Sequence, residues 1–344
     1  MKAVVFHEHG GPDRLRYEDR DPPGPPAPSE VVVRVKACAL NHLDVWIRQG
    51  IPAYRIALPH ISGSDVAGLV DQIGAGVERL QAGDRVIVSP GLSCWRCDRC
   101  LAGRDNQCPS YSILGAQVDG GYAQFVKVPA ANVLPIPGSL SFEDAAAFPL
   151  VSVTAWHMLF ALGELRPGET VLVMGAGSGV GSLAIQLARA AGARVVTTVG
   201  FDEKTPKASA LGADAVINHT REDVSKRVRV LTDGQGVDLV IEHIGPAVWE
   251  LCLQALRKGG RLVTCGATTG GEVTLDLRAL FSRQLTIRGS YMGTRAELVQ
   301  ATNLIGRGLV RPVVDRTFPL REARAAQEYM LDRRVFGKIV LTVD

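Results

Sequence analysis

Four cysteines lie close together in the chain, at a spacing typical of metal ligands. Cys94, Cys97, Cys100 and Cys108 follow the pattern C-x2-C-x2-C-x7-C in the run CWRCDRCLAGRDNQC. Thiolates at such short intervals can converge on one tetrahedral ion, and four sulfur ligands leave no coordination position open for a substrate. The pattern predicts one structural zinc ion per chain. An iron–sulfur cluster and four unrelated thiols are the alternatives.

A glycine-rich run, VLVMGAGSGVG at residues 171–181, begins with a short apolar segment. Glycine permits the positive φ of a tight turn and lets phosphate oxygens approach the main chain. A helix after the turn would direct free N–H groups and its positive dipole end at the phosphates. The run therefore predicts a dinucleotide-binding loop, although Val180 stands where the strict G-x-G-x-x-G pattern has its third glycine. The loop residues expected to bind the cofactor are Gly175, Ala176, Gly177, Ser178, Gly179, Val180 and Gly181.

The end of the next expected strand, residues 194–199, bears on the type of cofactor. NAD sites usually carry an Asp or Glu about 20 residues past the loop, where it binds the ribose 2′-OH. Here the strand ends at Gly200, with Lys204 close by, which leaves room and positive charge for a 2′-phosphate. Asp202 and Glu203 also follow, and acids there would suit the first turn of a helix. The sequence favours NADP, with NAD as the alternative.

The elements that must position these residues change character near Pro149. Strand patterns dominate before it, at residues 2–6, 31–37, 66–73, 85–88 and 122–128, with one short helix at 41–49. After it, strands are expected at 171–174, 194–199, 237–242, 261–265 and 285–289, and helices at 182–191, 203–211 and 248–256. This alternation is typical of an α/β fold with a doubly wound parallel sheet. Two further helices, 295–308 and 320–332, precede a closing strand at 338–343.

Length and composition fit a globular enzyme of two domains. The chain has 344 residues, of which 46% are hydrophobic and 21% charged, and its net charge is +3. This small charge gives no strong attraction to nucleic acid or to a membrane surface. No apolar run approaches the roughly 20 residues of a membrane span, and the N-terminus has no signal-peptide pattern. We expect a cytoplasmic protein that binds neither nucleic acid nor membranes and keeps its cysteines reduced.

Taken together, these motifs resemble those of the medium-chain dehydrogenase/reductase superfamily, which includes zinc-type alcohol dehydrogenases and quinone oxidoreductases. The resemblance covers nearly the whole chain. Besides the cysteines and the glycine-rich loop, it rests on VKACALNHLD (35–44), SGSDVAGLVDQIG (62–74), GDRV (83–86), DGGYAQFV (119–126), AAAFPLVSVTAW (145–156) and LGAD (211–214).

The resemblance implies the architecture and the reaction. It implies a β-rich GroES-like catalytic domain at residues 1–150 and 292–344, with a zinc lobe at about 90–110, and a Rossmann domain at 151–291. It also implies hydride transfer to or from nicotinamide C4, in an active site between the domains. A homodimer or homotetramer is expected, with residues 285–289 as the strand that pairs across a two-fold axis.

This chain differs from the alcohol dehydrogenases at the positions of their catalytic zinc ligands. Those enzymes supply a Cys, a His and a later Cys or Asp, and the corresponding positions here hold Asn41, Ser64 and Leu150. Amide and hydroxyl oxygens are weak zinc ligands, and leucine offers none. The chain is therefore expected to hold a structural zinc and no catalytic one.

Hydrogen-bond donors would then have to stabilise the oxyanion formed during reduction. The candidate catalytic residues are Asn41, His42, Asp44, Ser64 and Asp65, with Tyr54 and Tyr291 as further acid candidates. Asn41 can donate through its amide, and a histidine at position 42 can relay a proton. The alternatives are structural. Asn41 and Asp44 could cap a helix, His42 could be packed, and Asp65 could bind local backbone N–H groups.

Other cofactor contacts are implied by resemblance and by the ends of the parallel strands, where ligands of such sheets bind. They are Val153 and Thr154, Ile244 and Gly245, and Gly266, Ala267 and Thr268, with the segment 336–338 as a weaker candidate. Turn chemistry alone is the alternative explanation for these residues.

The expected absence of a catalytic zinc favours an activated substrate. A conjugated ketone or quinone delocalises the charge that hydride addition creates, whereas an unactivated alcohol must first lose a proton of high pKa. We therefore expect reduction of a small carbonyl, enone or quinone. The alternatives are a zinc alcohol dehydrogenase with unusual ligands from His42, His60, Asp44 and Asp65, and a catalytically idle binding protein.

Overall fold

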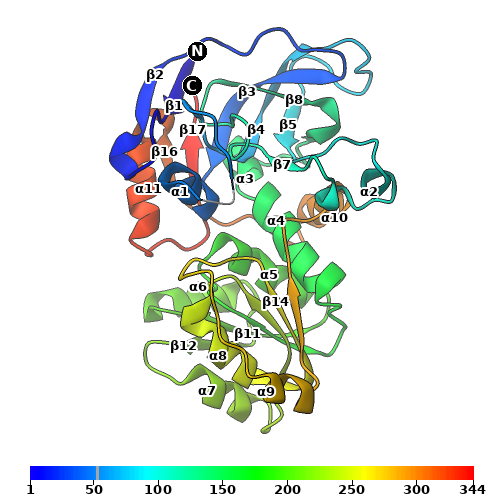
Figure 1. Ribbon diagram of the computed structural model, residues 1–344, viewed down its shortest axis with the longest axis vertical. Coiled ribbons are helices and arrows are strands. Elements are labelled where there is room, and N and C mark those ends of the chain that lie inside the picture. Colours follow the sequence, from blue (N-terminus) through cyan, green and yellow to red (C-terminus); the bar gives the residue numbers. More distant parts are fainter. Residues whose placement is uncertain (52–53) are drawn as a thin grey trace. The chain divides into compact units, whose positions relative to one another are not determined.

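The computed structural model describes residues 1–51 and 54–344, and these divide into two compact units (Figure 1). Unit 1 comprises Met1–Val151, Thr294–Gly306 and Pro312–Asp344. Unit 2 comprises Ser152–Gly293 and Arg307–Arg311. Each unit is built around its own sheet.

A seven-stranded sheet forms the centre of unit 1. Its strands are β3 (Glu30–Ala39), β4 (Asp65–Ile73), β5 (Arg85–Val88), β8 (Phe125–Pro129), β9 (Val133–Pro135), β16 (Val314–Pro319) and β17 (Lys338–Thr342). They run in the order β16-β17-β3-β4-β5-β9, and β8 also pairs with β3. Two small sheets complete the unit, β1 (Lys2–Val5) with β2 (Arg16–Asp19) and β6 (Gly91–Leu92) with β7 (Ser112–Ile113). The apolar residues of β3 are all buried, and three strands, β4, β8 and β17, pair with it.

The helices of unit 1 include α1, which follows directly after β3. They are α1 (His42–Gln49), α2 (Asp98–Leu101), α3 (Phe142–Ala146), α10 (Arg295–Gly306) and α11 (Ala323–Leu331), and α4 (Pro149–Trp156) begins in this unit. Asn41 is the N-cap of α1 and Asp44 its third residue, while Val45 and Ile47 are buried. The helix stops at Gly50, whose φ of 85° most residues avoid.

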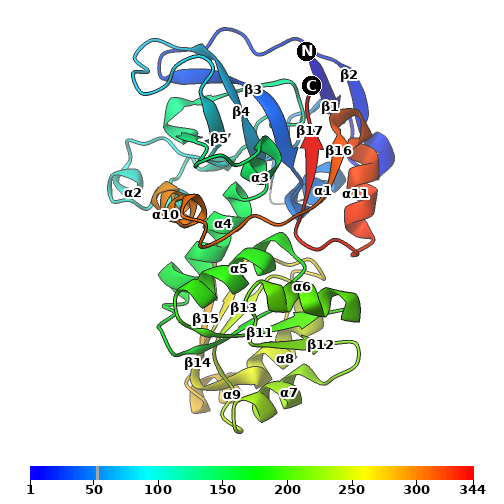
Figure 2. The same cartoon turned by 180° about the vertical axis from the view of Figure 1, so that it is seen from behind.

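Unit 2 contains a six-stranded parallel sheet in the order β12-β11-β10-β13-β14-β15 (Figure 2). Its strands are β10 (Thr170–Val173), β11 (Arg194–Val199), β12 (Ala215–Asn218), β13 (Val237–Glu242), β14 (Leu256–Thr264) and β15 (Thr286–Gly289). The main helices are α5 (Gly179–Ala190), α6 (Thr205–Ala210), α7 (Val224–Leu231), α8 (Pro246–Ala255) and α9 (Leu277–Ser282). This is the doubly wound order of dinucleotide-binding sheets, in which ligands bind where the chain changes direction between β10 and β13.

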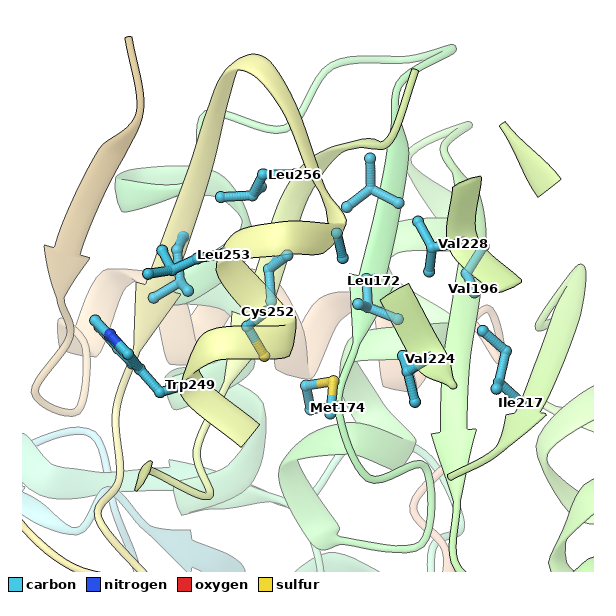
Figure 3. Close-up of a cluster of buried hydrophobic side chains, with 14 of the residues drawn as sticks. Leu172, Met174, Val196, Ile217, Val224, Val228, Trp249, Cys252, Leu253 and Leu256 are labelled. Carbon is cyan, nitrogen blue, oxygen red and sulfur yellow. The ribbon is translucent and has the colours of Figure 1, made fainter. Parts of the chain in front are cut away.

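A cluster of buried apolar side chains holds the strands of unit 2 against its helices (Figure 3). Leu172 and Val196 come from β10 and β11, Val228 from α7, and Cys252 and Leu253 from α8. The strands are apolar on both faces because helices cover both faces of such a sheet. This packing fixes the end of β10, from which the glycine-rich run continues.

Several sequence expectations differ from the observed elements; the strand expected at 261–265, for example, begins at Leu256 as β14. Two of the differences have a clear local cause. The helix expected at 182–191 begins at Gly179, because Ser178 Oγ accepts the N–H of Gly181 (2.8 Å) and so caps the helix earlier. The strand expected at 122–128 begins only at Phe125. Residues 120–122 instead donate their N–H groups to carbonyls of residues 61–63, which takes this segment out of the main sheet.

In the described ranges, no helix is both long enough and apolar enough to cross a membrane.

Candidate active site and cysteine lobe

The four cysteines of residues 94–108 converge in unit 1, and their sulfur atoms all lie within 4.8 Å of one another. Cys97 Sγ is 3.6 Å from Cys100 Sγ and 3.9 Å from Cys108 Sγ. Tetrahedral zinc with bonds of about 2.3 Å separates its sulfur ligands by about 3.8 Å, so the cluster fits this ion. The N–H groups of Arg96 and Cys97 lower the pKa of Cys94 to about 6, which favours the thiolate that a metal requires.

The lobe is also tied to the rest of unit 1 by Asp105. Its carboxylate accepts the N–H of Arg295 at the start of α10 (3.0 Å), and its carbonyl accepts the hydroxyl of Ser93 (2.8 Å). Among the described residues, the four cysteines are the only group of three or more His, Cys, Asp or Glu side chains that could share one ion.

The glycine-rich run forms a tight turn between β10 and α5 in unit 2. Gly175 has a φ of 68° and donates its N–H to Thr198 Oγ1 (2.9 Å), while Ala176 donates to Thr198 O (2.9 Å). A Cβ on Gly181 would lie 2.2 Å from Gly175 O, so only glycine lets α5 begin this close to the turn. The N-terminus of α5 therefore offers the free N–H groups that suit a pyrophosphate.

Sequence reasoning missed His243, which lies against this turn. Its Nε2 is 2.9 Å from Met174 O and 3.1 Å from Ser178 Oγ. A carbonyl can only accept, so Nε2 carries the proton and donates. The single Nε2 proton is shared between Met174 O and Ser178 Oγ, and Ser178 Oγ also accepts the N–H of Gly181, which leaves its own proton to donate to a ligand. Burial lowers the pKa of His243, and the neutral ring is favoured.

The ends of β13 and β14 are fixed by Glu242, another residue that the sequence did not single out. It is fully buried and accepts the N–H groups of Ile244 and Gly245 and the hydroxyl of Thr264. The two strand ends lie very close together: a Cβ on Gly266 would lie only 2.5 Å from His243 O, so glycine is needed there. Ala267, another expected cofactor contact, comes directly after Gly266. Thr154, also expected to contact the cofactor, is buried in α4.

At the end of β11, Gly200 carries no side chain and the nearby acid is already paired. Asp202 forms an ion pair with Arg221 (2.7 Å) and accepts the amide of Asn218. Lys204 Nζ lies 5.6 Å from the centre of the Phe201 ring. The neighbourhood of Gly200 thus contains two cations, Lys204 and Arg221, and two carboxylates, of which Asp202 is paired with Arg221 and the other is Glu203.

In unit 1, the end of β3 brings Asn41 next to Lys338 and Asp65. Val340 pairs with Ala39 in the β17–β3 ladder, and this register sets Lys338 opposite Asn41. Lys338 Nζ donates to Asn41 Oδ1 (2.6 Å) and to Asp65 Oδ2 (3.0 Å), and Asn41 Nδ2 also donates to Asp65 Oδ2 (2.9 Å). All three side chains are at least nine-tenths buried. The sequence indicated Lys338 only as a weak cofactor contact, because its partners lie some 270 to 300 residues away.

Asp65 connects the three segments that the resemblance assigns to catalytic zinc ligands. Its Oδ1 accepts the N–H of Leu150 (2.7 Å), its Oδ2 accepts the amide of Asn41, and Ser64 precedes it in the chain. Ser64 Oγ is buried and has no hydrogen-bond partner within residues 1–51 and 54–344. An amide, a hydroxyl and a leucine do not form a zinc site, so these residues do not fit a catalytic zinc.

Asp44 lies beside this group and is fully buried. Its carboxylate accepts the N–H of Asn41 (2.7 Å), the hydroxyl of Tyr122 (3.0 Å) and the N–H of Gly63 (3.2 Å). Burial raises the pKa of Asp44 to about 6, although these donors oppose the shift. By accepting the N–H of Asn41, Asp44 caps the N-terminus of α1 and holds the main chain of Asn41 in place.

The remaining candidates have other surroundings. His42 packs edge-on against Trp46, with 5.2 Å between ring centres. The ring of His60 contacts Gly115 O (3.2 Å) and Asp119 (3.4 Å). Tyr54 is half-buried in the loop after α1, and Tyr291 is exposed in unit 2.

Comparisons with known proteins identify the family. A family model described as "Alcohol dehydrogenase GroES-like domain" matches residues 27–138, and one described as "Zinc-binding dehydrogenase" matches residues 179–307. A zinc-type alcohol dehydrogenase-like protein of Schizosaccharomyces pombe is 34% identical over 100% of this chain and 99% of its own. Quinone oxidoreductase 1 of Escherichia coli is 32% identical over 98% of each chain.

A solved structure agrees with these sequence relatives. The crystal structure of an NAD-dependent alcohol dehydrogenase superposes with a TM-score of 0.96 at 47% identity and covers 100% of both chains. The expected GroES-like and Rossmann folds are therefore confirmed. The chain belongs to the medium-chain dehydrogenase/reductase superfamily and is an NAD(P)-dependent oxidoreductase of the alcohol dehydrogenase and quinone oxidoreductase type.

Proposed function

We propose that this chain reduces a small carbonyl, enone or quinone with NAD(P)H and uses no catalytic metal. The observation that carries the proposal is the group around Asp65. Asp65, which follows Ser64, accepts the amide of Asn41 and the N–H of Leu150, so it joins the three segments that carry the catalytic zinc ligands in alcohol dehydrogenases. Lys338 adds an ammonium, and Asn41, Ser64 and Leu150 form no set of metal ligands. Such donors can stabilise an oxyanion. The nicotinamide, when bound, supplies the hydride.

Residues of unit 2 would hold the dinucleotide. The N–H groups at the start of α5 and the Ser178 hydroxyl would bind the pyrophosphate, and His243 would keep that hydroxyl oriented. NADP is the proposed cofactor, because Lys204 and Arg221 lie near Gly200, where an NAD enzyme would present a free carboxylate.

The four cysteines would hold one structural zinc ion per chain. With all four ligands from sulfur, the ion would stabilise the lobe and take no part in hydride transfer. Substituting Cys100 with serine should abolish zinc binding and lower the melting temperature. The matched control, Cys265→Ser, changes a cysteine outside the lobe and should leave zinc bound.

Alcohol oxidation is the second candidate function. It is favoured by the 47% identical solved structure, which is that of an NAD-dependent alcohol dehydrogenase.

A substrate panel combined with metal analysis separates the two functions. The panel tests carbonyl substrates (enones, quinones and simple ketones) with NADPH and NADH. It tests primary and secondary alcohols with the oxidised forms of both cofactors. The proposal predicts reduction of conjugated carbonyls, with about one zinc per chain, as four sulfur ligands for a single ion require. Alcohol oxidation that depends on a second zinc would contradict it. Tight NADPH binding with no turnover on the whole panel would instead support the idle binding protein.

We further propose that the chain self-associates through unit 2. β15 forms an edge of the parallel sheet, and α9 just before it exposes Leu277 and Phe281, which are 66% and 70% exposed. These two residues are four apart and so share one face of α9. A second copy of the chain could pair with the β15 edge and cover that face.

A further inference from the structure

We infer that the ammonium group of Lys338 is the electrophile that binds the substrate oxygen. The proposal rests on the proposed function, reduction without a catalytic metal. It assigns one specific residue to the task that the missing zinc would perform in a related alcohol dehydrogenase.

The position of Lys338 is set by two strand pairings. β3 lies between β17 and β4, so the residue that starts β17 and the residue that starts β4 meet at the end of β3. Lys338 Nζ lies 2.6 Å from the amide oxygen of Asn41, which stands where alcohol dehydrogenases have their first catalytic zinc ligand. It also lies 3.0 Å from Asp65 Oδ2, next to Ser64 at the second position. A positive charge therefore sits among the residues that replace the metal ligands.

The hydrogen bonds of Lys338 leave one proton for a substrate. An ammonium group has three N–H bonds and accepts none. Nζ donates two of them, to Asn41 and to Asp65, and makes no third hydrogen bond within the described part of the chain. These two acceptors fix the direction of the group. The Lys338 side chain is only 4% exposed, so the charge acts in surroundings that screen it weakly.

For a ketone, a hydride adds to the carbon and a proton to the oxygen of the C=O bond. The carbonyl carbon would take up the hydride that the bound nicotinamide supplies and form the new C–H bond, while the C=O π pair moves onto oxygen. Lys338 Nζ stabilises the developing oxyanion by its hydrogen bond and then transfers that proton to it. The resulting amine takes a proton from water. For an enone, the hydride adds at the β-carbon and the enolate oxygen receives the same hydrogen bond.

The first test replaces Lys338 with methionine, which has a similar length and no charge. We expect kcat to fall by about 10²–10³-fold, the range seen when one oxyanion donor is removed. The dissociation constant of NADPH should change far less than kcat, and Lys338→Arg, which keeps the charge, should restore part of the lost rate. The matched control is Lys2→Met, which breaks an exposed lysine–aspartate pair (2.8 Å) and should leave kcat unchanged.

A double variant separates catalysis from folding. Lys338→Met leaves the Asp65 carboxylate buried and unpaired, which by itself destabilises the protein. Lys338→Met combined with Asp65→Asn removes both charges. We expect its melting temperature to recover toward that of the wild type while kcat stays low. If Lys338 were only a structural partner of Asp65, activity would recover together with stability, and the proposal would be wrong.

A spectroscopic readout does not depend on turnover. Infrared difference spectra are recorded for 2-cyclohexen-1-one bound together with oxidised cofactor. The carbonyl stretch should lie at lower frequency in the wild type than in Lys338→Met, because the ammonium polarises the bond. Equal frequencies would overturn the role of Lys338 even if metal-free reduction is confirmed. A second, catalytic zinc in the wild type would instead overturn the proposed function itself.

Discussion

Asn41 combines two tasks that the sequence presented as alternatives. Its backbone N–H is capped by Asp44 at the start of α1, while its side-chain amide bonds Asp65 and Lys338. The main chain and the side chain of one residue thus serve the helix and the candidate site separately. The capping explanation for Asn41 and Asp44 is confirmed without removing Asn41 from the site.

Gly200 tests the cofactor proposal at a single residue. Replacing it with aspartate should weaken NADPH binding at least about tenfold, roughly 1.4 kcal/mol, because the new carboxylate would repel the 2′-phosphate. NADH binding should strengthen, since aspartate can bind the ribose hydroxyl. The added Cβ would lie 3.2 Å from the exposed His219 ring, which can move aside. Fluorescence titration of both cofactors is the measurement, with Gly200→Ala as the control for size alone. An unchanged preference would argue against NADP.

Asp44 predicts how stability depends on pH. Its pKa is raised to about 6 in the folded chain, above the unfolded value near 3.9, so its neutral form favours folding. Its contribution is full below about pH 4 and is lost as the pH rises through about 6, on the order of 3 kcal/mol in total. The quantity to measure is the difference in unfolding free energy between wild type and Asp44→Asn from pH 4 to pH 8.

The Asp44→Asn variant loses one of the three accepted hydrogen bonds at every pH, so only the slope of the difference is informative. The wild type should lose stability relative to the variant as the pH rises. A slope of the opposite sign would mean that Asp44 is charged throughout this range.

At the scale of elements, α5 begins where Ser178 caps it, and the same side chain faces the dinucleotide loop. Ser178→Ala should cost about 1 kcal/mol of stability, as removal of a helix cap does. It should also weaken NADPH binding, because the free hydroxyl proton would be lost. Ser141→Ala is the matched control, since Ser141 caps α3 by accepting the N–H of Asp144 (3.0 Å). The control should lose stability and keep its affinity for NADPH; equal affinities for both variants would remove Ser178 from the cofactor site.

At the scale of the whole molecule, the self-association proposal predicts that a substitution in the contact lowers the mass of the assembly in solution. Phe281→Arg places a charge in the proposed contact and should shift the chain toward the monomer without unfolding it. Leu101→Arg changes a residue of the cysteine lobe that is 74% exposed, and it should leave the assembly intact. Sedimentation velocity measures both. If the wild type itself sediments as a monomer, or if both variants dissociate alike, α9 and β15 do not form the contact.

Much of the fold followed from local patterns in the sequence. The apolar strands 85–88, 194–199 and 237–242 are found with the boundaries that their composition predicted. The spacing of the four cysteines required no tertiary information, because residues so near in sequence must be near in space. The glycine-rich run was equally readable, since each glycine answers a local demand of the turn. Together with the other family-like segments, such as 35–44, 62–74 and 119–126, the cysteines and the glycine-rich run led to the predicted superfamily, which the comparisons confirmed.

Only the tertiary structure decided which side chains surround Asn41. Lys338 reaches it across 297 residues of sequence, and the contact exists because β17 pairs with β3 in one register. Likewise, His243 meets Ser178 because parallel strands end at one edge of a sheet. Local sequence encodes turns, caps and clustered ligands, whereas contacts between distant strands depend on the pairing of the whole sheet. The resemblance could therefore indicate that Asn41, Ser64 and Leu150 occupy the positions of the usual zinc ligands, and the fold was needed to show that Lys338 lies beside Asn41 and Asp65.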